Sequence, residues 1–557
     1  MALKLKISPT PIYHVLFSIL IGFFVGLAIL FLFNFYSGIL RLFQILINIS
    51  PFTIILTVTM GLTLAYLIVR LMATTKTGGC GTNQVVESYH YHSGFLHWKD
   101  TLSKTVAAAL TIGFGGSAGL EGPSILLGGG LASTLAQKLN LRPEEIRIFM
   151  LAGAAAGLAA IFKAPLTGIF FALEIPYQKD LVKEAFFPAS VASITSYLTF
   201  ISIMGSETLF PFVPTIIIPS IIDIVYVILV GFFSAFVALI FISFFKFMNT
   251  LKQKSKLNPS IYLLTAGIII GTIGLYFPQV LGVGYDTIHL SVTGKLFTTP
   301  LLILILILFL KIVVTSLTLN FGGSGGLFIP SIYVGAILGA AYVSLLGLGS
   351  HEIFIMASIA AVMAATSKTL LTSVAFVAET CGPSSIIPTL IAACVSFFAS
   401  GKLSFYESQL LRRPEEEEEA LGEAYHLLEE RGLKTTEIKA KDVMTPNPVI
   451  IPDGLKIKDA LKIMKEHRFR EYPVVDTHQR LIGYIEFEDL LSIPTRRWNS
   501  PIGQTLIHTP LTVLEEEDLS EIMRKMVEKG EDHAYVVTDY TSYRLVGVIA
   551  GIDAVSY

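Results

Sequence analysis

Residues 114–125 read FGGSAGLEGPSI and residues 321–332 read FGGSGGLFIPSI, so the chain contains nearly the same segment twice. The informative difference is one position, where the first copy has Glu121 and the second has Phe328. Each copy joins a glycine-rich break to a segment with an early proline. Proline suits the first helical turn because its missing N–H would be unpaired there. The repeat therefore predicts two helix N-termini, presented by related halves of the chain.

The composition is that of a protein embedded in a membrane. Of the 557 residues, 53% are hydrophobic and only 15% are charged, which argues against an ordinary soluble protein of this length. The long apolar runs lie at about 12–48, 51–73, 103–115, 221–246, 261–276, 299–319, 329–347 and 385–400. Other apolar segments are shorter than the ~20 residues that span a bilayer, which indicates tilted or broken helices.

The start of the chain gives an orientation. The first apolar run follows Lys4 and Lys6 and has no small-residue cleavage site, so we interpret it as a mature helix with a cytoplasmic N-terminus. Cys80, Cys381 and Cys394 lie in apolar or glycine-rich surroundings, a pattern typical of neither a disulfide framework nor a zinc site. We expect an integral protein of a prokaryotic cell membrane.

A second repeat extends the first. Residues 152–174 align with residues 357–379 at a constant offset of 205. The halves, about 51–205 and 221–406, then share one plan, and an odd number of spans in each half makes them inverted repeats. The alanines supply small faces for close helix packing. Two repeated lysines, Lys163 and Lys368, either line vestibules that concentrate anions or snorkel at helix ends.

The character of the chain changes after the membrane part, residues 1–411. Residues 412–436 form an acidic linker that includes five consecutive glutamates, Glu415 to Glu419. The segments 437–495 and 496–557 then repeat a pattern of strands with one amphipathic helix each, near 457–468 and 518–529. We predict a small α/β pair and place it in the cytoplasm.

Paired broken helices in a membrane indicate a substrate site near the bilayer midplane. Their N-termini present unpaired N–H groups and positive dipole ends, which favour an anion. Glu121 is itself an anion at such a terminus, so it would compete with the substrate when ionised and leave when protonated. A glutamate that caps a first helical turn is the alternative interpretation. The first hypothesis is an anion permease with a protonatable gate.

The motifs resemble those of the CLC family of chloride channels and chloride/proton antiporters, and the tail resembles a CBS-domain pair. GLEGP at 119–123 stands in the place of the gate motif G-x-E-G-P, and GLFIP at 326–330 fits G-x-F-x-P. GCGTN at 79–83 departs from G-S-G-x-P, with cysteine for serine and asparagine for proline, and Tyr406 fits a tyrosine near the final membrane helix. The implied fold is a polytopic α-helical membrane protein with inverted repeats and broken helices.

The resemblance implies a role for each matching residue. Glu121 would be the gate, and Tyr406 would donate its hydroxyl to a central chloride. The implied anion-binding residues are Cys80, Gly81, Gly119, Leu120, Leu327, Phe328, Ile329 and Tyr406. Family members of this kind are homodimers with one pore per subunit. The partners are then chloride as the transported ion, protons and membrane lipid, without nucleic acid.

The proton path decides between a channel and an exchanger. Coupled exchangers of the family commonly carry a second glutamate where this chain has Ile175, which cannot relay a proton. We therefore favour channel-like or weakly proton-coupled chloride conduction, with a proton path through Glu121 and Glu174 as the substitute route. The alternatives are a coupled chloride/proton antiporter and, more remotely, a cation-coupled transporter of a small organic anion. The membrane part has no nucleophile paired with a base, so we expect no enzyme.

The tail departs from the pattern of nucleotide-binding CBS modules. These modules usually place serine or threonine three residues before an aspartate that contacts ribose. Asp489 and Asp553 are present, but the upstream residues are Glu486 and Ala550. The pair is thus either a nucleotide sensor, in which these aspartates contact an adenine nucleotide, or a dimerisation and stability module.

Overall fold

The computed structural model describes residues 10–557 apart from 77, 211–219, 255–257, 298, 348–350, 414–437, 468, 470, 487–488, 491–492, 494–497, 505–506, 530, 532 and 552–557. The predicted acidic linker therefore lies almost entirely outside the described residues. The chain forms two compact units, residues 1–413 and residues 414–557, and each is described by itself.

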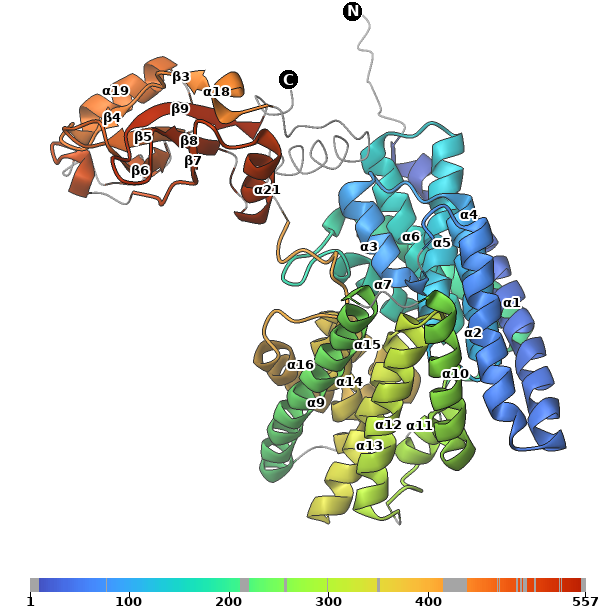
Figure 1. The fold of residues 1–557 in the computed structure, drawn as a ribbon. Helices are drawn as coiled ribbons and strands as arrows, with labels where there is room; N and C mark the ends of the chain where they lie inside the picture. The colour runs from blue at the N-terminus through green and yellow to red at the C-terminus, as the bar shows by residue number, and fades with distance from the viewer. Residues whose placement is uncertain are drawn as a thin grey trace, which may run out of the picture. The chain divides into compact units, whose positions relative to one another are not determined.

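We call residues 1–413 the membrane unit. Its described residues form a helical bundle (Figure 1), and two very short strands interrupt the helices. The elements of its first half are α1 Thr10–Ile49, α2 Thr53–Met72, β1 Gly79–Cys80, α3 Gly81–Tyr91, α4 Trp98–Gly113, α5 Glu121–Lys138, α6 Pro143–Phe162, α7 Pro165–Glu174 and α8 Phe186–Met204. Those of its second half are α9 Ile221–Lys254, α10 Pro259–Tyr276, α11 Tyr285–Val292, α12 Leu301–Asn320, β2 Ser324–Gly325, α13 Phe328–Leu346, α14 His351–Ser367, α15 Leu370–Cys381 and α16 Ile386–Ala399.

Eight of the described helices are long and apolar enough to span a membrane: α1, α2, α6, α8, α9, α10, α12 and α13. Each apolar run predicted from the sequence coincides with a helix. The runs did not reveal α6 and α8, because α6 is rich in alanine and glycine and serines and threonines interrupt α8. The predicted short helices are present too, since α3, α7, α11 and α15 are 8 to 12 residues long.

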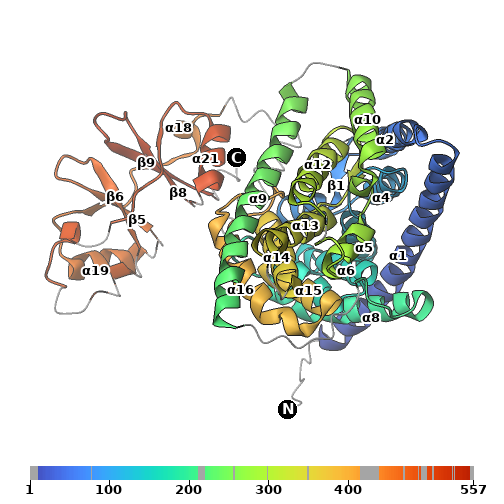
Figure 2. The same cartoon turned by 90° about the horizontal axis from the view of Figure 1, so that it is seen from below.

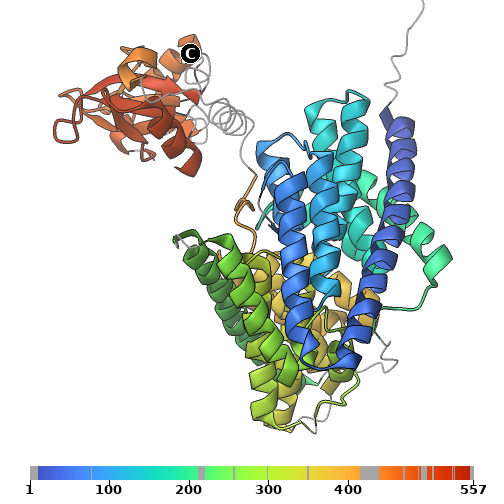
Figure 3. The same cartoon turned by 45° about the vertical axis from the view of Figure 1, so that its right-hand side comes forward.

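The helices form an interior and a periphery. Figure 2 shows α5, α6, α13 and α14 inside the bundle, with α1 and α9 at its edges. In the most apolar window of α6, 83% of residues are buried, whereas in α9 the share is 39%. The peripheral helices therefore turn apolar side chains outward, toward the place of lipid. Figure 3 shows α1 turning directly into antiparallel α2.

The two glycine-rich breaks are held by reciprocal contacts between the halves. Gly115 and Gly322 adopt left-handed φ angles of 96° and 111°, where a side chain would be strained. The hydroxyl of Thr318 accepts from the Ser117 N–H at 3.2 Å. The hydroxyl of Thr111, from the other half, accepts from the Ser324 N–H at 3.1 Å. This exchange is what two repeats related by a two-fold axis produce.

A second reciprocal pair joins α7 and α15. The carboxylate of Glu174, at the end of α7, accepts from the Leu371 and Thr372 N–H groups at 2.7 and 2.8 Å. The carboxylate of Glu379, on α15, accepts from the N–H groups of Leu166 and Thr167 at 2.8 and 2.7 Å. Each carboxylate therefore caps the N-terminus of the other half's helix, where unpaired N–H groups need acceptors.

We call residues 414–557 the tail unit. Its described residues contain two small sheets and two amphipathic helices, α19 Ile457–His467 and α21 Leu519–Lys529. Both helices were predicted from the sequence. The elements of the sheets, with a short helix, are α18 Ala440–Val443, β3 Thr445–Pro446, β4 Ile451–Pro452, β5 Glu471–Val475, β6 Leu481–Glu486, β7 Thr512–Leu514, β8 His533–Val537 and β9 Leu545–Ala550. The strand orders are β4-β5-β6 and β3-β9-β8-β7. The first segment of the tail thus lends β3 to the second sheet.

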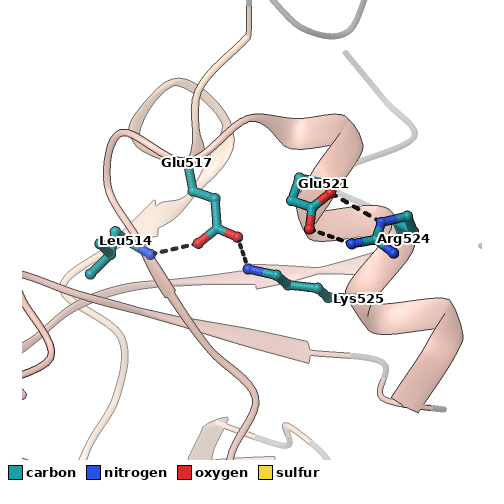
Figure 4. Close-up of polar contacts among 5 residues, drawn as sticks. All are labelled: Leu514, Glu517, Glu521, Arg524 and Lys525. Carbon is teal, nitrogen blue, oxygen red and sulfur yellow. Dashed lines mark hydrogen bonds and ion pairs between the residues drawn. The ribbon is translucent and has the colours of Figure 1, made fainter.

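Ion pairs fix α21 beside its sheet (Figure 4). Glu517 accepts from the Leu514 N–H at 3.2 Å and pairs with Lys525 of α21. Glu521 and Arg524 form a bidentate pair one helical turn apart on the same helix. The first pair connects the helix to the end of β7, whereas the second is exposed and adds little stability.

Candidate anion site

Two loops from the two halves meet in the interior of the membrane unit. Gly119 and Gly326 exchange two backbone hydrogen bonds, of 3.0 and 2.8 Å. Beside them β1 pairs in parallel with β2, so that Cys80 lies opposite Gly325. These pairings bring the N-termini of α3, α5 and α13 together. The two predicted helix starts are confirmed, since α5 begins at Glu121 and α13 at Phe328.

Glu121 occupies the N-terminus of the opposite repeat's helix. Its Oε1 accepts from the backbone N–H of Phe328 at 2.7 Å and from that of Ile329 at 3.2 Å. The side chain is fully buried. The first turn of α13 therefore binds a carboxylate through the unpaired N–H groups that a helix offers to an anion.

The second oxygen of Glu121 has no such support. Oε2 is buried and makes no hydrogen bond within the described part of the chain. Space for the carboxylate exists because Gly119 and Gly326 lack side chains, since a Cβ on either glycine would overlap it. One oxygen bound by two donors and one left free is a geometry in which the free oxygen can accept a proton.

Among the described residues, Lys311 of α12 is the charged side chain from another element that acts electrostatically on Glu121. The charge of Glu121 in turn acts on Tyr285 of α11, Tyr406 and Cys80. Sequence analysis missed Lys311, although a lysine inside the apolar run 299–319 was a signal. A charge within a membrane segment is costly and is retained where it has partners.

The remaining predicted site residues lie around this centre. Cys80 precedes the first turn of α3, and Gly81 approaches the backbone of Gly122 so closely that a Cβ would meet its carbonyl oxygen at 2.6 Å. Tyr406 is buried near Cys80, and its N–H donates to the Ser404 Oγ at 3.2 Å. The resemblance implied that this tyrosine lies near the start of the final membrane helix. Residues 400–413 contain no helix, and residues 414–437 lie outside the described residues, so this expectation stays a prediction.

A cavity of about 660 Å³ leads to the same centre. Its lining includes Cys80 and Leu327 of the site together with the cationic side chains of Lys104 and Lys252. The Lys104 ammonium donates to the Thr75 hydroxyl and to the side-chain oxygen of Gln84, both at 2.9 Å. The lining also includes the carboxyl side chains of Glu87, Asp100 and Glu407, so a vestibule with charges of both signs reaches the interior of the bundle.

The repeated lysines of the sequence do not line this vestibule. Lys163 donates to the Glu207 carbonyl at 2.9 Å, and Lys368 donates to the Ser400 hydroxyl at 2.6 Å. Both residues adopt left-handed backbone conformations at the ends of their helices, with φ of 53° and 56°. Their place in the repeat is therefore at equivalent helix ends.

The predicted tail residues are described only in part. Asp553 lies outside the described residues. The Asp489 carboxylate contacts Nε2 of His508 at 2.9 Å and accepts from the Glu486 N–H at 3.1 Å. His508 in turn stacks on Tyr484, with ring centroids 5.1 Å apart. The carboxylate that would face a ribose is engaged within the protein.

Apolar helices of membrane-spanning length surround a helix N-terminus that holds a carboxylate, which defines a membrane protein with a candidate anion site. A family model described as voltage gated chloride channel matches residues 60–401, and a CBS-domain model matches residues 440–495 and 502–557. The chain belongs to the CLC family of chloride channels and transporters and carries a C-terminal pair of CBS domains.

Relatives agree with this assignment. An uncharacterized protein of Methanocaldococcus jannaschii is 32% identical over 321 residues, which cover 57% of this chain and 79% of the relative. The voltage-gated ClC-type chloride channel ClcB of Shigella flexneri is 28% identical over 309 residues, covering 54% and 72%.

Solved structures show the same fold. A CLC-type fluoride/proton antiporter superposes with a TM-score of 0.63 at 23% identity, covering 72% of this chain and 98% of that structure. A slow cyanobacterial Cl⁻/H⁺ antiporter superposes with a TM-score of 0.63 at 22% identity, covering 71% and 96%. At these identities the likeness concerns the fold.

Proposed function

We propose that the protein conducts chloride across the membrane through a pore gated by Glu121, in a channel-like or weakly proton-coupled manner. The observation that carries the proposal is the Glu121 carboxylate bound by the first N–H groups of α13. An ionised carboxylate in that position excludes chloride. A protonated one loses most of its attraction to the N–H groups and leaves the position to the ion.

Converging donors make such a site workable. A charge at the bilayer midplane costs about 2.5–3.5 kcal/mol on insertion scales, whereas one helix terminus returns about 0.3–1 kcal/mol. Several termini are therefore needed, and α3, α5 and α13 meet here. Cys80, Gly81, Gly119, Leu120, Leu327, Phe328, Ile329 and Tyr406 are the proposed anion-binding residues. Backbone donors hold the ion weakly enough to release it.

Two residues favour weak proton coupling. Ile175 cannot carry a proton, and both oxygens of Glu174 are engaged by the first turn of α15. The second candidate is a coupled chloride/proton antiporter, which is favoured by the fold shared with the cyanobacterial Cl⁻/H⁺ antiporter. In that case Glu174 would be the inner proton carrier.

Purified protein in liposomes separates the two. We expect an imposed chloride gradient to drive chloride flux that falls as pH rises, with no uphill movement of protons. Protein-free liposomes supply the baseline for leak. Protons pumped against their gradient at a fixed ratio to chloride would establish the antiporter instead, and absence of chloride flux would overturn both.

The assembly and the tail complete the proposal. We infer a homodimer with one pore per subunit and a tail that stabilises it from the cytoplasm. Light scattering of the detergent-solubilised protein measures the mass. Because Asp489 is already bound by His508, calorimetric titration of the full chain with ATP, AMP or a cyclic dinucleotide should give no binding heat. A saturable heat would favour the nucleotide sensor.

A further inference from the structure

Lys311 is a buried cation within the apolar helix α12. Its side chain has no exposed surface. The ammonium donates to the carbonyl oxygens of Val280 and Gly282 at 3.1 and 3.0 Å. It also lies 4.6 Å from the centroid of the Tyr333 ring, a cation–π distance. Lys311 is the charged residue of α12. The two carbonyl oxygens and the aromatic ring therefore take the place of water around its ammonium group.

The groups that hold Lys311 are tied to both halves of the anion site. The N–H of Gly282 donates to the Gly115 carbonyl at 3.2 Å, in the glycine break that precedes Glu121. Tyr333 belongs to α13, whose first turn binds the Glu121 carboxylate, and its hydroxyl donates to the Gln279 carbonyl at 3.2 Å. One partner of the ammonium is thus hydrogen-bonded to the glycine break before Glu121, and another belongs to the helix whose first turn binds the Glu121 carboxylate.

Lys311 is the cationic member of the groups that act on Glu121. The charge of an ionised Glu121 also acts on Tyr285, Tyr406 and Cys80, which lie on other elements and are neutral unless they lose a proton. Lys311 donates to carbonyl oxygens and Glu121 accepts from backbone N–H groups, so the lysine acts on the carboxylate without a direct ion pair. Such an arrangement attracts an anion without the tight contact that would trap it.

We propose that Lys311 is a positioning residue that supplies a fixed positive charge to the anion site and thereby sets the pH at which Glu121 opens it. This inference rests on the proposed function. The charge favours whichever anion occupies the N–H groups of α13, the ionised Glu121 or chloride. Without it, the ionised carboxylate is less stable, so Glu121 takes up a proton at higher pH.

Three substitutions test the charge separately from the hydrogen bonds. Lys311→Arg keeps the charge, Lys311→Gln keeps N–H donors without charge, and Lys311→Met removes both. We expect the pH midpoint of chloride flux in liposomes to rise by about one unit for Gln and Met and to stay near wild type for Arg, since a nearby opposite charge shifts a carboxyl by about 1–3 units. A purely structural lysine predicts that Gln behaves like wild type, which would overturn the proposal.

Two further measurements keep the test independent of transport and of folding. Calorimetric titration of the purified full chain with chloride should show about tenfold weaker binding for Lys311→Gln than for Lys311→Arg, and equal binding would also overturn the proposal. This readout stands even if liposomes show no chloride flux, an outcome that instead contradicts the proposed function. If Lys311→Met aggregates, the double variant Lys311→Met/Glu121→Gln should recover monodisperse protein, and continued aggregation would count against the electrostatic action of Lys311 on Glu121.

Discussion

At the scale of single residues, Glu121 is a carboxylate placed at the proposed anion site, the N-terminus of α13. Its two N–H partners come from α13, whereas its own helix is α5. A contact across the two halves does not by itself distinguish a gate from a cap, since Glu174 and Glu379 cap helices of the opposite half in the same way. Glu121 differs because its buried Oε2 has no hydrogen-bond partner in the described part of the chain. This difference supports the gate over the capping interpretation and makes the pH dependence of transport the property to measure.

Replacing Glu121 should remove that dependence. In the wild type, chloride flux should fall as pH rises. Above the pH midpoint the fall should approach about tenfold per pH unit, because the protonated fraction of one titrating group decreases by that factor. Glu121→Gln and Glu121→Ala should give flux that is high and flat across the same range, measured in liposomes at fixed chloride gradient. Glu144→Gln, an exposed carboxyl at the start of α6, is the matched control. Unchanged pH dependence in the Glu121 variants would refute the gate.

The glycine beside Glu121 tests whether chloride and the carboxylate share one position. The three atoms nearest to a Cβ at Gly119 all belong to the Glu121 carboxylate, which is the end of a flexible side chain, so an alanine there competes first with that carboxylate for space. If chloride uses the same space, Gly119→Ala should lower flux by about tenfold or more, which corresponds to about 1.4 kcal/mol of lost binding. The loss should persist in the Glu121→Ala background.

The control for this substitution is Gly38→Ala, because a Cβ at that position meets nothing within 4 Å. It should leave flux unchanged. Should Gly119→Ala prove silent once Glu121 is alanine, the added methyl group would be affecting only the glutamate, and the position would not belong to chloride.

At the scale of elements, the repeated helices α7 and α15 carry equivalent glutamates, so a substitution of one glutamate serves as the control for the same substitution of the other. Glu174 and Glu379 make equivalent contacts, each with two N–H groups and one threonine hydroxyl. A structural role would be shared by both glutamates, whereas a proton path would use only Glu174. Comparing substitutions of the two residues therefore separates an effect on stability from an effect on proton transfer.

Glu174→Gln and Glu379→Gln should each destabilise the protein by about 1–3 kcal/mol, because a neutral amide with one acceptor oxygen replaces two charged ones. Thermal unfolding in detergent, followed by intrinsic fluorescence, measures this loss. Proton movement in liposomes should be the same for both variants. If only Glu174→Gln changes it, Glu174 lies on the proton path.

How far the sequence predicts these elements depends on the kind of signal. Repeated motifs identified the helix starts at Glu121 and Phe328, because glycine and proline act locally on the backbone. The reciprocal caps of Glu174 and Glu379 were visible as repeated residues but not as contacts, since pairing between halves needs the tertiary fold. Lys311 was overlooked because an apolar run is recognised by its average hydropathy, which one lysine changes little. The contacts that accommodate Lys311 come from Val280 and Gly282, which the sequence alone does not place beside it.

At the scale of the whole molecule, the described residues of the candidate anion site belong to one of the two compact units. Glu121, its N–H donors, Lys311 and the vestibule all belong to residues 1–413, and the tail forms a separate compact unit. The superposition with the fluoride/proton antiporter covers 72% of this chain and 98% of that structure. Almost the whole of that structure therefore matches only a part of this chain. The source of pH sensitivity should therefore lie in the membrane unit.

Removal of residues 414–557 tests this division. We expect the truncated protein in liposomes to keep the pH midpoint of chloride flux within about 0.3 unit of the full chain, because the N–H groups that bind the Glu121 carboxylate belong to residues 1–413. Flux per protein should be compared at equal reconstituted amounts, with Glu121→Gln in the truncated background as the control that flattens the curve. A midpoint that moves by a unit or more would instead make the tail part of the gate. The titratable groups of its two sheets, beginning with the His508 and Asp489 pair, would then be the first to replace.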